Sequence, residues 1–202
     1  GQARLTATHV GAYVDCPMRF FLNNVAGLQE PEKVPDTLER SDMGTVLHNT
    51  LEKLYQPYVG QRLTEEAFNA MEADLPTQLQ VTAREKVPAL RDRVSGYNKV
   101  LLSVVERMGL DVIRHDRTLA PFRLVAVEQK LAGRLRLADG RYVHLQGIAD
   151  RVDFCEASGA YRLLDYKTGA VKAPKKKLTL EEVFHPGNPY KEALQTLTYA
   201  WM

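Results

Sequence analysis

An acid and a base stand two residues apart in an apolar stretch near the C-terminal end of the chain. Residues 163–169 read LLDYKTG, with Asp165 and Lys167 on either side of Tyr166. In a pleated strand, residues i and i+2 point to one face, so Asp165 and Lys167 would share a face and Tyr166 would pack on the other. Buried charges are unfavourable unless they are paired or bind a metal ion. The stretch is therefore predicted to be either a structural ion pair or a functional site.

A second acid lies on the apolar stretch that precedes this one. Asp150 occurs in GIADRVDF, where alternation places it on the face of Ile148 and Val152. By the same alternation, Asp153 falls on the opposite face. The turn EASG then returns the chain, and because neighbouring strands lie about 5 Å apart, the carboxylates of Asp150 and Asp165 could reach one cation. Mg²⁺ often binds through one or two protein carboxylates, so this spacing favours a divalent metal site.

The elements that must position these acids change in character partway along the chain. Helical periodicity is expected near residues 6–25, with a break at Pro17. A Pro-rich loop is expected at 27–40, and further helices at 41–58, 63–80 and 88–115. Alternation predicts strands at 122–137, 141–154 and 160–169, followed by a loop over 170–189 with a short helix at 178–184, and a last helix over 189–202. This order predicts one α/β domain over residues 1–202, helical to about 118 and with a mixed sheet from about 119. We expect its first two strands to be antiparallel. Because the chain ends inside an apolar helix, we also expect it to be a fragment truncated at its C-terminus.

Composition limits the functional classes. The 202 residues are 45% hydrophobic and 26% charged, which allows one sizeable core. A run of about 18 apolar residues and an apolar signal segment are both missing, so no membrane span is expected and a cytoplasmic location is predicted. The net charge of +2 does not by itself indicate nucleic-acid binding. Cys16 and Cys155 are the only cysteines, which favours a reducing compartment over a disulfide scaffold.

Five motifs occur together in a recognisable order. They are Y-x-x-C-P-x-x-F (Tyr13, Cys16, Pro17 and Phe20), G-x-x-x-H (Gly44 and His48), G-x-x-D (Gly147 and Asp150), D-x-K (Asp165 and Lys167) and Q-x-x-x-Y (Gln195 and Tyr199). This set resembles the RecB-like branch of the PD-(D/E)XK nucleases, which includes nuclease domains of bacterial helicase–nuclease repair complexes and CRISPR-associated exonucleases. D-x-K alone is a weak signal, whereas five ordered motifs are specific. Ala149 replaces the proline of the superfamily name.

The resemblance implies a fold and a metal site. The fold would be restriction-endonuclease-like, a mixed β-sheet flanked by helices with a helical N-terminal half. Asp150, Asp165 and His48 would bind Mg²⁺ or Mn²⁺, with Glu128 of the first long strand as a lower-ranked ligand. Lys167 would orient and activate the attacking water, and the ion would stabilise charge on the phosphate. His48 lies at the edge of an apolar helix face, which suits a neutral imidazole that reaches a metal.

Two further groups are candidates for contact with DNA. Gln195 and Tyr199 are i, i+4 neighbours on the last predicted helix, and their amide and phenol would face phosphate or base. Four lysines follow the D-x-K motif closely, namely Lys172, Lys175, Lys176 and Lys177. Such a run is usually a solvated loop, and phosphate steering is the second interpretation. The other histidines, His9, His115, His144 and His185, show no partner pattern and are predicted to be structural.

Cys16 has its own interpretation within the family. Some RecB-like nucleases use a cysteine at this position, with three more near the C-terminus, to hold an iron–sulfur cluster. A cluster usually needs four thiolates, and these 202 residues offer only Cys16 and Cys155. No cluster is therefore expected here, and Cys16 is predicted to be a small buried packing residue. A longer native chain that supplies three more cysteines would restore it as a ligand.

These observations predict a metal-dependent DNA nuclease domain of a DNA repair helicase–nuclease. An exonuclease acting on single-stranded DNA ends is expected, with a helicase domain or subunit as partner. The alternative is a catalytically silent DNA-binding or scaffolding module of a repair complex. A third and remoter interpretation is an unrelated fold in which Asp165 and Lys167 form an ordinary ion pair. Glu128 is as consistent with a solvated strand face as with the site.

Overall fold

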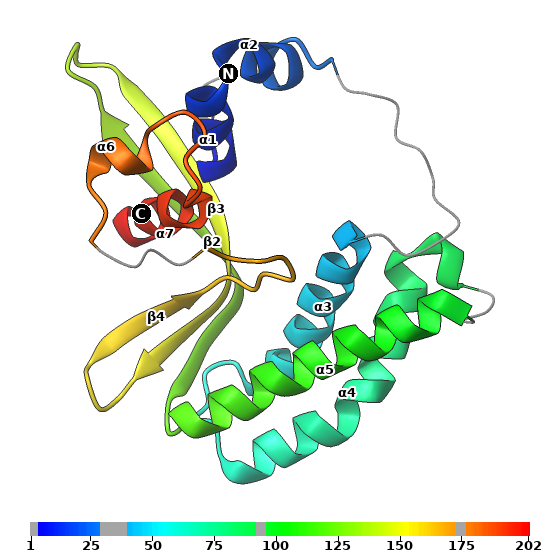
Figure 1. Ribbon diagram of the computed structural model, residues 1–202. Helices are drawn as coiled ribbons and strands as arrows, with labels where there is room; N and C mark the ends of the chain where they lie inside the picture. The colour runs from blue at the N-terminus through cyan, green and yellow to red at the C-terminus, as the bar shows by residue number, and fades with distance from the viewer. Residues whose placement is uncertain (1–3, 29–39, 92–95, 173–176) are drawn as a thin grey trace. The chain divides into compact units, whose positions relative to one another are not determined.

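The chain divides into two compact units, each assembled from separate stretches of sequence. The computed structural model describes residues 4–28, 40–91, 96–172 and 177–202 (Figure 1). The first unit comprises Gly1–Glu32, Lys130–Ile148 and Ala170–Met202, and the second comprises Lys33–Gln129 and Ala149–Gly169. Each unit thus combines helical and strand-forming stretches. Among the described helices, none is long and apolar enough to cross a membrane.

Three long helices build the core of the second unit. They are α3 (Arg40–Tyr55), α4 (Glu65–Lys86) and α5 (Gly96–Leu119), with short 3₁₀ turns η2 (Gln56–Tyr58) and η3 (Pro88–Leu90) beside them. Apolar side chains recur at helical spacing on α3, and Val46, Leu47, Leu51 and Leu54 are all buried, as their periodicity predicts. Phe122 and Leu124, where strand β2 begins, belong to the same hydrophobic cluster.

Helix α4 begins where the sequence predicts and ends later. The Thr64 side chain accepts the N–H of Ala67 at 3.4 Å, which caps the first turn. The helix was expected to end near residue 80, but it continues to Lys86 with Pro76 inside it. Proline usually disrupts a helix interior. Here Leu79 and Ala83, beyond the proline, are still buried in the core, so tertiary packing outweighs the local penalty.

The sheet is mixed, as predicted, and within the described residues it has four strands where three were expected. The strands are β1 (Arg4–Leu5), β2 (Arg123–Arg136), β3 (Tyr142–Cys155) and β4 (Ala160–Leu164), in the order β1–β3–β2 with β4 also paired to β3. Strand β1 runs parallel to β3 and β4 runs antiparallel to it. A short turn joins β2 to β3, where Leu137 donates its N–H to the carbonyl of Arg141. So short a connection permits only antiparallel neighbours.

Two strand predictions need correction. Strand β1 was not expected, because two residues are too few to show alternation. Strand β4 was expected to run through residue 169, but it ends at Leu164. Asp165, Tyr166 and Lys167 therefore follow the strand instead of lying on it.

The N-terminal helices of the first unit meet at Pro17, as predicted. Helix α1 (Ala7–Asp15) is capped by Thr6, whose hydroxyl accepts the N–H of His9 while His9 Nδ1 accepts the N–H of Thr6. Helix α2 (Pro17–Phe20) restarts the chain and leads into the π-helix η1 (Phe21–Val25). Tyr13 and Phe20 pack edge to face across this junction, with ring centroids 5.7 Å apart. The Y-x-x-C-P-x-x-F motif thus has a packing role.

The C-terminal part of the first unit packs on the β2–β3 hairpin. Helix α6 (Leu180–Val183) is short, and α7 (Lys191–Trp201) carries two aromatic side chains that approach hairpin glycines. A Cβ atom at Gly147 would lie 2.5 Å from Tyr199, and one at Gly133 would lie 2.5 Å from Trp201. Both glycines are therefore required for the close approach of α7.

Candidate active site

Asp150 is held against the segment that carries the D-x-K motif. In the β3–β4 ladder Arg151 is opposite Leu164, so the next position along the antiparallel register places Asp150 opposite Asp165. The Asp150 carboxylate accepts the backbone N–H of Tyr166 at 2.5 Å. A side-chain hydrogen bond thus continues the contact between the two segments after the ladder ends.

His48 of α3 joins the same group. Its Nδ1 lies 3.2 Å from Asp150 Oδ2, and its Nε2 lies 2.6 Å from the carbonyl oxygen of Tyr166. Both partners are acceptors, and imidazole donates from both nitrogens only when it is protonated. The hydrogen bond to Asp150 accordingly raises the pKa of His48. A neutral ring was expected from the sequence, whereas this arrangement favours the imidazolium.

Gly44, one helical turn before His48, allows α3 to approach the D-x-K segment. A Cβ atom at Gly44 would lie 3.3 Å from the hydroxyl oxygen of Thr168. That distance is shorter than most Cβ contacts, so a larger residue would push Thr168 away. The G-x-x-x-H spacing therefore lets the backbone of α3 lie close to Thr168 while His48 reaches Asp150.

Asp165 and Lys167 form the ion pair that their spacing suggests. The Lys167 ammonium contacts the Asp165 carboxylate, and the two side chains are 35% and 23% exposed respectively. The negative charge of Asp165 also contributes to the raised pKa of His48, although less than the hydrogen bond to Asp150. The pair is thus partly accessible to solvent and lies within electrostatic reach of the histidine.

Glu128 lies on β2 with an unusual backbone conformation. Its φ is +48°, in the left-handed region, so the regular alternation of side chains along β2 is interrupted at this residue. Partial burial and then the charges of Asp150 and Glu52 raise the pKa of Glu128. Glu52 was not singled out in the sequence, although it lies four residues after His48 on the same helix stripe.

A buried charge network lies beside these residues. The guanidinium of Arg151 is fully buried and donates to both carboxylate oxygens of Asp116, at 2.5 and 2.9 Å, and to Asp153 at 2.9 Å. It also donates to the hydroxyl of Tyr166 at 3.0 Å. Asp153 was expected on the face away from the apolar side, but it is completely buried. Ion pairs with Arg151 of its own strand and with Arg162 of β4 make that burial tolerable, and alternation along a single strand does not reveal them.

Comparison with known sequences decides the family. The family model of the PD-(D/E)XK nuclease superfamily matches residues 4–202, which is almost the entire chain. The chain belongs to the PD-(D/E)XK nuclease superfamily. The expected fold agrees with this membership, since a mixed four-stranded sheet and a helical N-terminal half are both present.

Bacterial relatives of this superfamily member are much longer than the chain itself. One is a subunit of the ATP-dependent helicase/deoxyribonuclease of Geobacillus kaustophilus, 29% identical over 202 residues, covering 91% of this chain and 16% of the relative. The corresponding subunit from Moorella thermoacetica is 26% identical over 180 residues, covering 82% of this chain and 15% of the relative. The chain thus spans about a sixth of the length of these relatives.

The donor set matches the metal chemistry of the superfamily, whose members generally depend on divalent metal ions. Carboxylate oxygens are the protein donors that suit Mg²⁺ and Mn²⁺. Partial burial is the main cause of the raised pKa of Glu128, and the negative charges of Asp150 and Glu52 add to it. Within the described ranges, however, no three His, Cys, Asp or Glu side chains are gathered so that they could hold an ion. Asp150 and Asp165 instead face His48 and Lys167, so an ion would have to replace these partners.

The Q-x-x-x-Y pair of this nuclease family lies in the first unit. Gln195 Nε2 donates to the hydroxyl of Tyr199 at 2.9 Å, so the two polar groups lie on one side of α7. Tyr199 lines a hollow of about 590 Å³ together with Arg4, Lys130 and Gly147.

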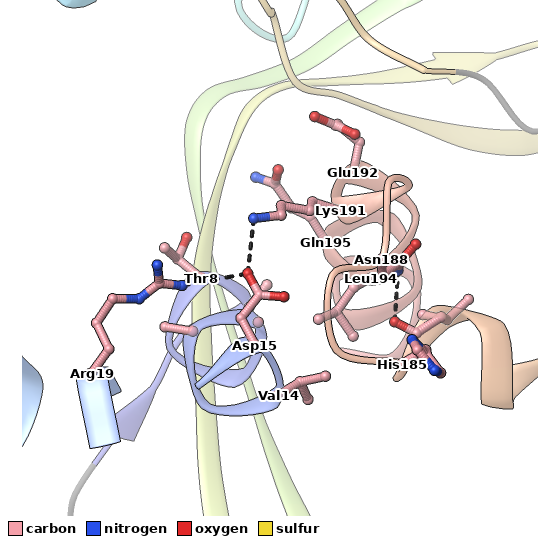
Figure 2. Close-up of a pocket in the computed structure, with 14 residues that line it drawn as sticks. Thr8, Val14, Asp15, Arg19, His185, Asn188, Lys191, Glu192, Leu194 and Gln195 are labelled. Carbon is pink, nitrogen blue, oxygen red and sulfur yellow. Dashed lines mark hydrogen bonds and ion pairs between the residues drawn. The ribbon is translucent and has the colours of Figure 1, made fainter. Parts of the chain in front are cut away.

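Gln195 lines a second cavity, of about 370 Å³, between α1 and the C-terminal segment (Figure 2). Asp15 projects from α1 toward α7 and accepts a 2.8 Å bond from Lys191. Its other contacts are the N–H of Gly187 and the guanidinium of Arg19. The cations of this cavity are therefore already engaged with Asp15.

The remaining candidates are only partly described. Lys172 places its ammonium 5.5 Å from the centre of the Tyr190 ring, and Lys177 is exposed. Lys175 and Lys176 lie outside the described residues. Cys16 and Cys155 are free thiols of intermediate burial.

Proposed function

We propose that the chain is a metal-dependent DNA nuclease domain that hydrolyses phosphodiester bonds. Superfamily membership supports the reaction class. The observation that carries the proposal is the convergence of Asp150, His48 and the D-x-K segment on Tyr166, whose backbone contacts both Asp150 and His48. Elements from α3, β3 and the end of β4 thereby meet at one place.

Each side chain has a chemical role in this proposal. Asp150, Asp165 and His48 would hold Mg²⁺ or Mn²⁺, with Glu128 in support. The ion supplies stabilisation of negative charge on the phosphate and on the leaving oxygen. Lys167, next to Asp165, orients the attacking water and favours its deprotonation. Gln195 and Tyr199 contact the phosphate or base of the bound strand.

The relatives suggest the biological setting. Two of them are named as a subunit of an ATP-dependent helicase/deoxyribonuclease. We therefore propose that DNA is the substrate, that a helicase domain or subunit is the partner, and that the chain works in DNA repair. Exonucleolytic cutting of single-stranded ends belongs to the same proposal.

A nuclease assay with matched variants tests the reaction. Linear single-stranded DNA is incubated with the purified chain and Mg²⁺ or Mn²⁺, with chelator as the metal-free control. Asp165→Asn and Lys167→Met should each reduce cleavage by at least about 10³-fold, because each removes a group that acts in the transition state. Asp111→Asn is the matched control, since Asp111 forms an exposed pair with Arg107 on α5. Full cleavage by Asp165→Asn would refute the nuclease assignment.

The form of the DNA tests the exonuclease proposal. A circular single strand offers no ends, so it should survive under conditions in which the matching linear strand is degraded. Rapid cutting of the circle would show an endonuclease instead. The same assay with linear duplex DNA measures the preference for single strands.

One observation favours the alternative of a catalytically silent DNA-binding module. Asp150 and Asp165 are paired with cationic side chains, and the described residues hold no ready three-ligand group for a metal ion. In that case the chain would bind DNA but cleave none with either metal. Metal-stimulated cleavage that Asp165→Asn abolishes would exclude this alternative.

A further inference from the structure

We propose that Arg151 is a positioning residue for the D-x-K segment and acts through the hydroxyl of Tyr166. The proposal rests on the proposed nuclease function, because the segment in question carries Asp165 and Lys167. Arg151 itself lies on β3, next to Asp150, but its side chain is buried on the other side of the strand.

The guanidinium of Arg151 is fixed firmly in the second unit. Two hydrogen bonds run to Asp116 of α5 and one to Asp153 of its own strand. The Tyr55 hydroxyl donates to Asp116 at 2.5 Å, and the Tyr55 ring centre lies 4.6 Å from the guanidinium carbon. A planar donor with several fixed partners has little freedom to rotate. Arg151 is therefore a rigid point of attachment for any group that it binds.

Tyr166 connects this attachment point to the candidate active site. Its hydroxyl accepts from Arg151 at 3.0 Å, while its backbone N–H donates to Asp150 and its carbonyl oxygen faces His48. Because β4 ends at Leu164, the strand ladder does not hold this residue. The Arg151–Tyr166 bond therefore holds the Tyr166 side chain in place. Through that side chain it also positions the Tyr166 backbone and the neighbouring residues Asp165 and Lys167.

A purely stabilising role for the network is the competing explanation, and two tyrosines separate the two roles. Buried ionic groups often contribute to folding alone. Tyr166 and Tyr55 both place a hydroxyl in the network, but Tyr166 lies in the D-x-K segment, whereas Tyr55 ends α3 and bonds to Asp116. Tyr→Phe at either position removes one oxygen and keeps the ring.

The first experiment compares Tyr166→Phe and Tyr55→Phe in steady-state DNA cleavage by the full 202-residue chain. Tyr166→Phe should lower kcat about tenfold, since a displaced catalytic group loses transition-state contacts, while KM stays within about twofold. Tyr55→Phe should keep kcat within about twofold at a similar loss of stability. Equal losses of kcat in both variants, or unchanged kcat in Tyr166→Phe, would overturn the proposal.

The second experiment does not depend on catalysis. Hydrogen exchange of the amide at residue 166 reports the bond to Asp150, and it should accelerate about tenfold in Tyr166→Phe and stay unchanged in Tyr55→Phe. An unchanged amide in Tyr166→Phe contradicts the positioning role. If the wild-type chain cleaves no DNA, the proposed function fails, and the exchange measurement still decides whether Arg151 positions the segment.

Discussion

At the level of single residues, Glu128 combines backbone strain with a side chain near acidic neighbours. A glutamate at a φ of +48° is less favourable than glycine, because its Cβ crowds the backbone. We predict that Glu128→Gly raises the free energy of unfolding by up to about 1 kcal/mol, measured by urea denaturation. If Glu128 supports the metal, the same variant should cleave DNA more slowly.

Glu128→Ala is the matched control for this prediction. Alanine removes the carboxylate but keeps a Cβ, so it should lose activity to the same extent without gaining stability. A lower free energy of unfolding for Glu128→Gly than for Glu128→Ala would show that the left-handed conformation carries no strain. Equal activity of both variants with the wild type would remove Glu128 from the site.

At the level of elements, the packing of α7 on the β2–β3 hairpin depends on glycine. We predict that Gly147→Ala lowers the free energy of unfolding by about 1–3 kcal/mol, because the added Cβ would lie 2.5 Å from the Tyr199 ring. Thermal unfolding is a suitable measurement, since even 1 kcal/mol shifts Tm by several degrees in a small unit.

A glycine in open space provides the comparison. A Cβ atom at Gly169 would meet no other atom within 4 Å, and its φ is not in the left-handed region. Gly169→Ala should therefore change stability by no more than about 0.5 kcal/mol. If Gly147→Ala proved as harmless as Gly169→Ala, α7 would have to shift easily on the hairpin.

The buried network joins α5 to β3, and its cation should matter for folding. Arg151→Met leaves Asp116 and Asp153 buried without their main partner, so we predict a loss of about 3–5 kcal/mol in chemical denaturation. Arg107→Met on the exposed face of α5 breaks only a surface pair and should cost less than about 1 kcal/mol. Comparable losses in the two variants would show that burial adds nothing to the strength of the Arg151 contacts.

For the whole molecule, the two units differ in how much apolar surface they bury. The large hydrophobic cluster lies entirely within the second unit, while the described part of the first unit buries few apolar side chains. We predict that the first unit unfolds at lower urea concentration. Trp201, the only tryptophan, reports on the first unit by fluorescence, and far-UV circular dichroism reports mainly on α3, α4 and α5. Coincident transitions by both probes would instead indicate one cooperative structure.

The sequence predicts local features well and distant partners poorly. The beginning of α4 and the buried stripe of α3 follow from local pattern, whereas the contact of Asp165 with Lys167 was one of two interpretations that their spacing left open. The Arg151–Asp116 contact joins residues 35 positions apart, and nothing in their local patterns indicates that they meet. The metal ligands and the DNA contacts named from the family motifs remain predictions.

The interleaved assembly of the units has a practical consequence for deletion mapping. The chain passes from one unit to the other four times, after residues 32, 129, 148 and 169. A truncation from either end of the chain therefore removes part of one unit before the other unit is complete. The remaining unit is then incomplete or carries an unfolded segment of its neighbour. Loss of cutting in such a clone would not locate the catalytic residues. Point substitutions and internal linker replacements are the genetic tools suited to this architecture.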